Sequence, residues 1–202
     1  MTASEILLTH KSIRKYKDKP IEQGLLDEII TLSCRASTTG NMQVYSVVNT
    51  TDVLLKKKLA PAHFNQKMVF EAPNILTFCA DFNRFNRWCE ANDASPGYDN
   101  FLSFMTAAID VLLVSQNVTM LAEERGLGIC YLGTTLYNAD SIIEILHLPK
   151  GVVPITTLTI GWPDESPKLT DRLPLDAILH QETYNNYSEA RINEIYAEKE
   201  NL

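Results

Sequence analysis

The amino-acid sequence predicts a protein of the α/β or α+β class, with one sheet between helices. Segments with apolar residues at helical spacing alternate along the chain with short β-branched and aromatic runs, a pattern typical of a sheet covered by helices. The chain has 202 residues, of which 45% are hydrophobic and 21% charged. These values are those of a globular domain that can bury a sizeable core.

Local signals predict the helices in order. Thr2-Ala-Ser-Glu5 is a capping box at the start of the first helix, and Gly126 ends the longest one with a C-cap signature. The predicted helices are Ala3–Thr9, Glu22–Arg35, Asp52–Leu59, Asp99–Arg125, a helix from Asp140 or Ser141 to His147, and a charged tail Asn186–Glu200.

Four runs rich in β-branched and aromatic residues predict strands. These runs are Val44–Asn49, Ile75–Cys79, Leu127–Leu132 and Val152–Ile160. Between the elements, a basic segment is expected to run extended to Pro20, Ser37–Gln43 is a polar loop, and three prolines stiffen Gly161–Pro174. Ala80–Trp88 is polar and mixed and predicts no regular element.

The longest predicted helix, Asp99–Arg125, is apolar on nearly every face. A helix of this kind is buried on all sides. It is either the central core helix of one domain, or a helix that a second subunit partly covers. The sequence pattern leaves both interpretations open.

The first twenty residues carry an unusual local charge. The whole chain is acidic, with 25 Asp and Glu against 18 Lys and Arg and a net charge of −7. Within HKSIRKYKDKP, from His10 to Pro20, five Lys and Arg residues face a single acid, Asp18. A phosphate would explain this run, because it accepts charge-assisted hydrogen bonds from Arg, Lys and Ser together. A solvated basic edge is the alternative.

Composition and missing motifs disfavour several functional classes. The acidic balance argues against non-specific binding to nucleic acid or to an anionic membrane. The GxGxxG, P-loop, GxSxG and HExxH motifs are absent, and the four histidines show no metal-ligand spacing. Because the sequence shows no recognisable nucleophile–base pair, catalysis would depend on a bound cofactor.

Cysteine usage and the N-terminus predict the compartment. The four cysteines form no CxxC pair and lie in or beside apolar runs, so we expect reduced thiols in a cytoplasmic protein. The N-terminus shows no signal-peptide pattern. The apolar region Phe101–Leu113 is broken by polar residues, which argues against a membrane span.

Four patches could together form a cofactor cradle. They are His10–Arg14, the loop Ser37–Gln43, the strand end Tyr131–Thr134 and the late basic element Lys168–Arg172. In this order they resemble the FMN-dependent nitroreductase family over almost the whole chain. HKSIRKYKDKPI resembles its opening flavin motif, RASTTGNMQVYS its second flavin loop, and GLGICYLG with LPKGVVPITTLTIGWPDESPKLTDRLP its C-terminal pair. FCADFNR and HQETY resemble more narrowly the NADPH-preferring branch of oxygen-insensitive nitroreductases and flavin reductases.

The resemblance implies a fold and an activity. The fold would be a mixed central sheet flanked by helices, in an intertwined homodimer with tightly but non-covalently bound FMN at the interface. Residues 1–202 would form a single FMN-binding domain with 184–202 as a charged helical tail, and Asp99–Arg125 would lie at or near the dimer contact. NAD(P)H would reduce the flavin, and a nitroaromatic, quinone or flavin acceptor would then take two electrons by a ping-pong mechanism.

The resemblance also assigns binding roles, with the chemistry left to FMN and no catalytic side chain. The residues around the phosphate would be Lys11, Ser12 and Arg172, with His10 beside them. Arg14 would reach the ribityl chain and the N1–O2 edge of the ring, where it would tune the flavin.

The remaining roles concern the flavin ring. The residues that reach the ring and ribityl chain from the partner subunit would be Ser37, Thr39, Asn41 and Gln43. Gln66 would contact the pyrimidine end. The residues that cover the other side, near N5 and O4, would be Tyr131, Leu132, Gly133 and Thr134.

The chain departs from this branch at two places, and two other classes stay open. Thr170 stands where the branch often has Lys, and the branch usually continues past the position of Leu202 with basic residues for a nucleotide 2′-phosphate. A flavin-binding carrier or sensor without turnover would use the same cradle. A cofactor-free oligomeric scaffold would leave the basic run solvated.

Overall fold

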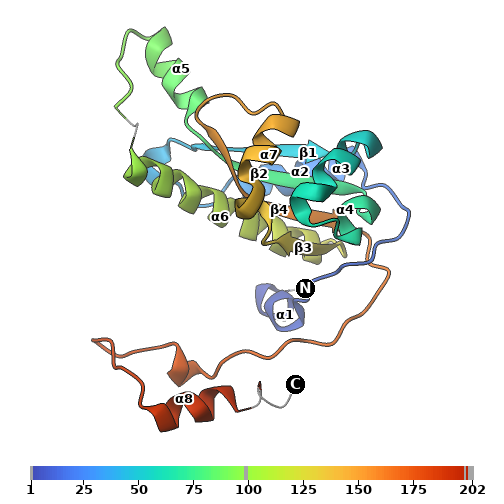
Figure 1. The fold of residues 1–202 in the computed structure, drawn as a ribbon, viewed down its shortest axis with the longest axis vertical. Coiled ribbons are helices and arrows are strands. Elements are labelled where there is room, and N and C mark those ends of the chain that lie inside the picture. The colour runs from blue at the N-terminus through green and yellow to red at the C-terminus, as the bar shows by residue number, and fades with distance from the viewer. Residues whose placement is uncertain (1, 98–99, 198, 200–202) are drawn as a thin grey trace. The chain divides into compact units, whose positions relative to one another are not determined.

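The protein is described by a computed structural model that covers residues 2–97, 100–197 and 199. Its elements are shown in Figure 1. The chain forms two compact units, Met1–Lys168 and Leu169–Leu202. The sheet and its covering helices lie in the first unit.

A four-stranded antiparallel sheet forms the centre of the first unit, in the order β1-β2-β4-β3. The strands are β1 (Tyr45–Thr50), β2 (Asn74–Asp81), β3 (Gly128–Leu132) and β4 (Val152–Gly161). An isolated parallel bridge between Ser12 and Ile129 adds a contact beyond the antiparallel ladders. The predicted class is confirmed, and each predicted strand lies within two residues of an observed one.

Helices cover both faces of this sheet (Figure 1). The helices α2 (Gln23–Ser33) and α6 (Phe101–Glu124) pack on one face and form the larger core with side chains of all four strands. The helices on the other face are α3 (Val53–Leu59), α4 (Lys67–Glu71) and α7 (Ala139–Ile145). Because successive strand side chains alternate between faces, Ile129 joins the α2–α6 core, whereas its neighbour Cys130 joins the α4 side.

The shorter elements complete the chain. They are the helix α1 (Ala3–Thr9) and the 3₁₀ turns η1 (Thr39–Asn41), η2 (Ala60–His63) and η3 (Thr135–Asn138) in the first unit, and η4 (Leu175–Ala177) and the helix α8 (Glu189–Tyr196) in the second. The predicted capping box of α1 is confirmed, because Glu5 N donates to Thr2 Oγ1 at 3.3 Å and Thr2 N donates to Glu5 Oε2 at 2.7 Å.

The predicted tail helix is shorter than expected. Its observed part begins after Ser188, whose hydroxyl accepts from Arg191 N at 3.2 Å and so caps the first turn. The predicted last residue, Glu200, lies outside the described residues, as does Asp99, the predicted first residue of the long helix.

The long helix α6 presents two different faces. Ala107, Val111, Val114 and Val118 are fully buried against the sheet and α2, or nearly so. By length and composition α6 could cross a membrane, but this packing identifies it as the core helix of the first unit. A second stripe of large apolar side chains is 40–76% exposed, and its members are Phe101, Leu102, Met105, Ile109, Leu112 and Leu113. We call these six residues the α6 stripe.

The helix α5 (Asn83–Ala91) was not predicted. The expectation of no regular element at Ala80–Trp88 is wrong: residues up to Asp81 extend β2, and α5 follows. Its few apolar residues, Phe85, Trp88 and Cys89, do recur at helical spacing. The helix was missed because the rest of this short segment is polar. The five-residue α4 was missed as well, because it is too short to show a period.

Candidate functional site

The basic N-terminal motif is fixed to the edge of the sheet beside β3. Ile13 N donates to Ile129 O at 2.8 Å, and Lys17 N donates to Trp162 O at 2.8 Å. The side chains of Ile13 and Tyr16 are buried, and the Tyr16 hydroxyl donates to Ile13 O at 2.6 Å. Two buried anchors therefore hold the motif in place.

Two residues of this motif, Lys11 and Arg14, have polar neighbours. Lys11 Nζ donates to Ser166 Oγ at 3.2 Å. Arg14 is exposed, and its backbone N–H donates to Glu165 Oε1. Burial raises the pKa of the Cys130 thiol, while the nearby Arg14 guanidinium and Ser12 hydroxyl oppose that rise, so these three side chains lie together.

His10 is held by a carboxylate. Its Nδ1 lies 2.7 Å from Glu123 Oε1 at the end of α6. Burial raises the pKa of Glu123, and the hydrogen bond from His10 partly offsets this effect. The His10 ring therefore ties the start of the motif to α6.

A buried polar cluster surrounds the turn that follows β3. His63 is fully buried, and its Nδ1 lies 2.9 Å from the Thr134 hydroxyl. Burial lowers the pKa of His63 to about 4, so the ring is neutral near pH 7. The buried atoms His63 Nε2 and Gln66 Oε1 have no hydrogen-bond partner among the described residues. Sequence reasoning treated His63 as a surface or packing residue, because a lone histidine gives no signal.

The predicted residues Tyr131 to Thr134 point in different directions. The Tyr131 hydroxyl donates to Ser115 Oγ on α6 at 3.1 Å. Leu132 faces the opposite side of the sheet and is buried with α4. Gly133 is exposed, and a Cβ atom there would meet nothing within 4 Å. Strand alternation thus separates the side chains of Tyr131 and Leu132.

The loop Ser37–Gln43 is anchored on α6. Thr38 Oγ1 donates to Asp110 Oδ2, and Thr39 N donates to Asp110 Oδ1 at 3.1 Å. Gln43 Nε2 donates to Asn41 Oδ1 at 3.2 Å, and Arg84 donates to Gln43 O. Asp110, Thr38 and Arg84 were not predicted as site residues, since no local pattern relates them.

The predicted cradle is divided between two edges of the sheet. The Ser37–Gln43 loop leads into β1, whereas His10–Arg14 and Tyr131–Thr134 lie at β3. With β2 and β4 between them, the edge strands are about 14 Å apart at the usual strand spacing. Within one chain, Ser37, Thr39, Asn41 and Gln43 therefore do not join the other predicted residues.

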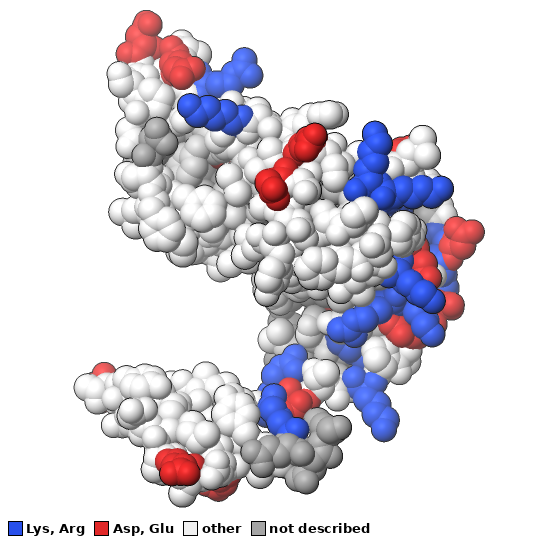
Figure 2. Space-filling model, viewed as in Figure 1, with Lys and Arg blue, Asp and Glu red and all other residues white. Residues whose placement is uncertain are grey.

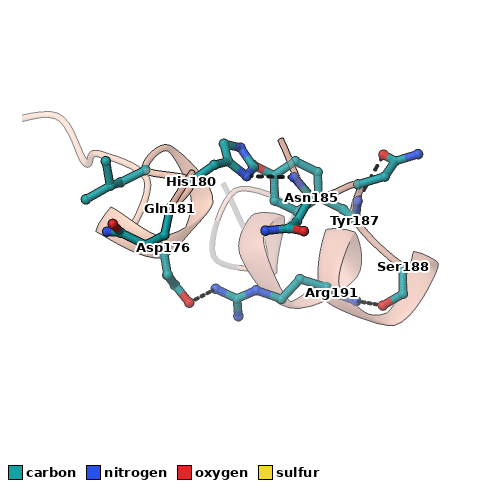
Figure 3. Close-up of a pocket in the computed structure, with 9 residues that line it drawn as sticks. Asp176, His180, Gln181, Asn185, Tyr187, Ser188 and Arg191 are labelled. Carbon is teal, nitrogen blue, oxygen red and sulfur yellow. Dashed lines mark hydrogen bonds and ion pairs between the residues drawn. The ribbon is translucent and has the colours of Figure 1, made fainter. Parts of the chain in front are cut away.

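The last predicted residue, Arg172, lies in the second unit. Its guanidinium donates to the Thr170 hydroxyl at 2.7 Å and to Asp171 O at 2.8 Å. The same unit contains a pocket of about 470 Å³, lined by His180, Tyr187 and Arg191 among others (Figure 3). Arg191 donates to Asp176 there, so this cation is already paired.

The first unit has pockets beside the Ser37–Gln43 loop and beside α5. A pocket of about 540 Å³ is lined by Met42, Gln43, Tyr45 and Arg84 among others. A larger one of about 570 Å³ lies between α5 and the start of α6. Figure 2 shows Lys and Arg side chains gathered over α3 and the N-terminal segment, with acids among them. Among the described residues, no group of three His, Cys, Asp or Glu could hold a metal ion.

Comparison with known proteins gives the family. The model of the nitroreductase family matches residues 7–162. The chain is 36% identical over 197 residues to an oxygen-insensitive NADPH nitroreductase of Salmonella typhimurium, covering 96% of this chain and 80% of that protein. It is 33% identical to an FMN reductase (NADPH) of Bacillus subtilis, covering 90% of this chain and 74% of the relative.

A solved structure has a similar fold. The NADPH:FMN oxidoreductase from Vibrio harveyi, complexed with NAD⁺, superposes with a TM-score of 0.92 at 29% identity, covering 98% of this chain and 85% of that one. Fold, motif order and sequence identity lead to the same conclusion: the chain belongs to the nitroreductase family.

Proposed function

We propose that this protein is an FMN-dependent oxidoreductase that moves two electrons from NAD(P)H to nitroaromatic, quinone or flavin acceptors. The observation that carries the proposal is the basic motif His10–Arg14, fixed against β3 in a chain of the nitroreductase family. The named activities of the relatives, NADPH nitroreductase and FMN reductase, support the same reaction class.

The motif suits the phosphate of FMN. Among the described residues, the Lys11 and Arg14 side chains have no carboxylate within ion-pair distance. The Lys11 partner is the neutral Ser166 hydroxyl. Charges without a carboxylate partner remain available to an anion. We therefore assign the phosphate to Lys11, Ser12 and Arg172, with His10 beside them.

The turn after β3 suits the flavin ring. Gln66 Oε1 is a buried acceptor that needs a donor, and the flavin N3–H is a donor of the right kind. Gly133 leaves open space at the strand end, where a flat ring could approach the backbone. Gln66, Tyr131, Leu132, Gly133 and Thr134 would surround the ring.

FMN would supply the redox chemistry, taking a hydride from the nicotinamide and passing two electrons to the acceptor. The protein would contribute binding and electrostatics. The Arg14 guanidinium would stabilise negative charge at the N1–O2 edge. Nucleotide and acceptor would use the same open face in turn, which predicts ping-pong kinetics.

We further propose that the enzyme is a cytoplasmic homodimer. The α6 stripe is an exposed apolar surface suited to a second copy of the chain. Ser37, Thr39, Asn41 and Gln43 would reach the flavin of the partner from the opposite sheet edge. We also propose that residues 1–202 form a single FMN-binding domain. The four free cysteines are consistent with a reducing compartment.

Anaerobic rapid mixing of the purified protein, loaded with FMN, against NADH or NADPH tests this proposal. An enzyme should lose its flavin absorbance within the assay and regain it when a quinone or nitroaromatic is added. A carrier or sensor, the alternative, would bind FMN and stay yellow. Protein that takes up no FMN would contradict both.

A further inference from the structure

The one acid buried in the middle of α6 calls for an explanation. Asp110 is only 1% exposed, on a helix whose neighbouring side chains are mostly apolar. Within the described part of the chain it has no ion-pair partner. A buried charge without a cation is costly, so its hydrogen bonds must compensate.

Those hydrogen bonds all go to one loop. One carboxylate oxygen accepts from the Thr38 hydroxyl and the other from Thr39 N at 3.1 Å. The Thr38 oxygen in turn accepts from Gln43 N at 3.1 Å. The Thr38 hydroxyl therefore links Asp110 to the far end of the loop, and Arg84 holds the Gln43 carbonyl from the other side.

The backbone of this loop needs external support. Gly40, Asn41 and Gln43 have φ values of 58°, 53° and 51°. The left-handed region is unfavourable for residues other than glycine, and such conformations persist only where surrounding contacts impose them. The Asp110–Thr38–Gln43 chain is a contact of this kind, because it joins both ends of the strained segment.

We propose that Asp110 is a positioning residue for flavin binding, acting through Thr38. It holds the loop in the shape that presents Ser37, Thr39, Asn41 and Gln43, and it does not touch the flavin. Since Asp110 and the α6 stripe share one helix, the same contact fixes the loop relative to the surface expected to meet the second subunit. This inference rests on the proposed function.

The sharpest test compares Thr38→Val with Thr38→Ser. Valine keeps the shape of threonine and removes the hydroxyl, whereas serine keeps the hydroxyl. Quenching of FMN fluorescence on titration gives the dissociation constant of each variant. We expect Thr38→Val to weaken FMN binding by about tenfold to a hundredfold, as for a lost hydrogen bond to a charged group. Thr38→Ser should stay close to the unmodified protein.

Hydrogen exchange of the FMN-free protein gives a second readout. The amides of Thr39 and Gln43 should exchange faster in Thr38→Val than in Thr31→Val, a change at an exposed helix position that serves as the control. Asp110→Asn should keep most of the affinity, because an amide can accept from Thr39 N and donate to Thr38. Asp110→Ala should lose it, although this variant is at greater risk of misfolding.

The outcomes separate this inference from the proposed function. If the unmodified protein binds FMN and Thr38→Val binds it equally well, the positioning role is wrong and the function stands. A lower melting temperature with unchanged FMN affinity would show a purely structural role and also overturn it. If the unmodified protein takes up no FMN, the proposed function fails first, and the positioning role fails with it.

Discussion

Ile13 N donates to Ile129 O at 2.8 Å, and this contact exists only because residue 128 is a glycine. A Cβ atom at Gly128 would lie 2.6 Å from Ile13 Cγ1, closer than such atoms approach in proteins. The absence of one side chain on β3 thus lets the basic motif lie against the sheet edge.

Gly128→Ala should therefore displace the motif. We expect a loss of about 1–3 kcal/mol in the free energy of unfolding, the usual cost of overpacking, together with weaker FMN binding. Gly24→Ala is the matched control, because a Cβ at this helix position meets nothing within 4 Å. It should stabilise the protein by about 0.5–1 kcal/mol. Urea unfolding measures the free energy of unfolding of each variant. Equal values for Gly128→Ala and Gly24→Ala would contradict the packing argument.

The role proposed for Lys11 predicts loss of cofactor. Lys11→Ala removes a cation whose partner is a neutral hydroxyl, so its main effect should fall on an anionic ligand. After dialysis, the variant should retain much less FMN than Lys57→Ala, a control at an exposed position of α3. Equal yellow colour in the two variants would argue against a phosphate contact at Lys11.

The role proposed for Arg14 predicts a change in redox potential. If Arg14 favours the reduced flavin by about 1.4 kcal/mol, Arg14→Ala should lower the two-electron potential by about 30 mV. Reduction by the nicotinamide should slow accordingly. Spectroelectrochemical titration measures the potential, with Arg87→Ala on exposed α5 as the control. An unchanged potential would refute this role.

The α6 stripe predicts a dimer contact. Ile109 is 52% exposed in the single chain, and burying a carboxylate there would be costly. Ile109→Asp should weaken the dimer by about a hundredfold or more, as seen by sedimentation velocity over a dilution series. Leu54→Asp, at a 67% exposed position on α3, should leave the dimer intact. A dimer that survives Ile109→Asp would place the contact elsewhere.

His63 predicts a pH dependence of stability. Burial lowers the pKa of its ring from 6.5 to about 4, so the folded state binds fewer protons than the unfolded state. The contribution of the neutral His63 ring to the free energy of unfolding is therefore complete above pH 6.5, and it disappears as the pH falls toward 4. The loss is at most about 3 kcal/mol.

His63→Gln removes the titrating group and keeps a side chain that can contact Thr134. Between pH 6.5 and 4, its free energy of unfolding should fall less steeply than that of the unmodified protein, by up to about 1.4 kcal/mol per pH unit. Guanidinium unfolding at several pH values measures the slopes. Parallel slopes would mean that His63 titrates normally in the folded protein.

Local sequence determined most of the elements of this protein. Strand composition, the Thr2–Glu5 capping box and the stop at Gly126 are signals among neighbouring residues, and the structure agrees with each. The cluster of cations from Lys11 to Lys19 is equally local, and it predicted an anion site that remains a proposal. The failure at α5 also has a local origin, because the polar composition of that short segment outweighed the helical spacing of its few apolar residues.

The tertiary structure alone decided which distant residues meet. Asp110 and Thr38 are 72 residues apart in the chain, and His63 and Thr134 are 71 apart. No sequence pattern relates such pairs, because their contact depends on the strand order and on which face each helix covers. Strand order likewise placed the Ser37–Gln43 loop and the β3 turn at opposite edges of the sheet. A charge in an apolar helix or a lone histidine acquires a role only through the partner that packing brings to it.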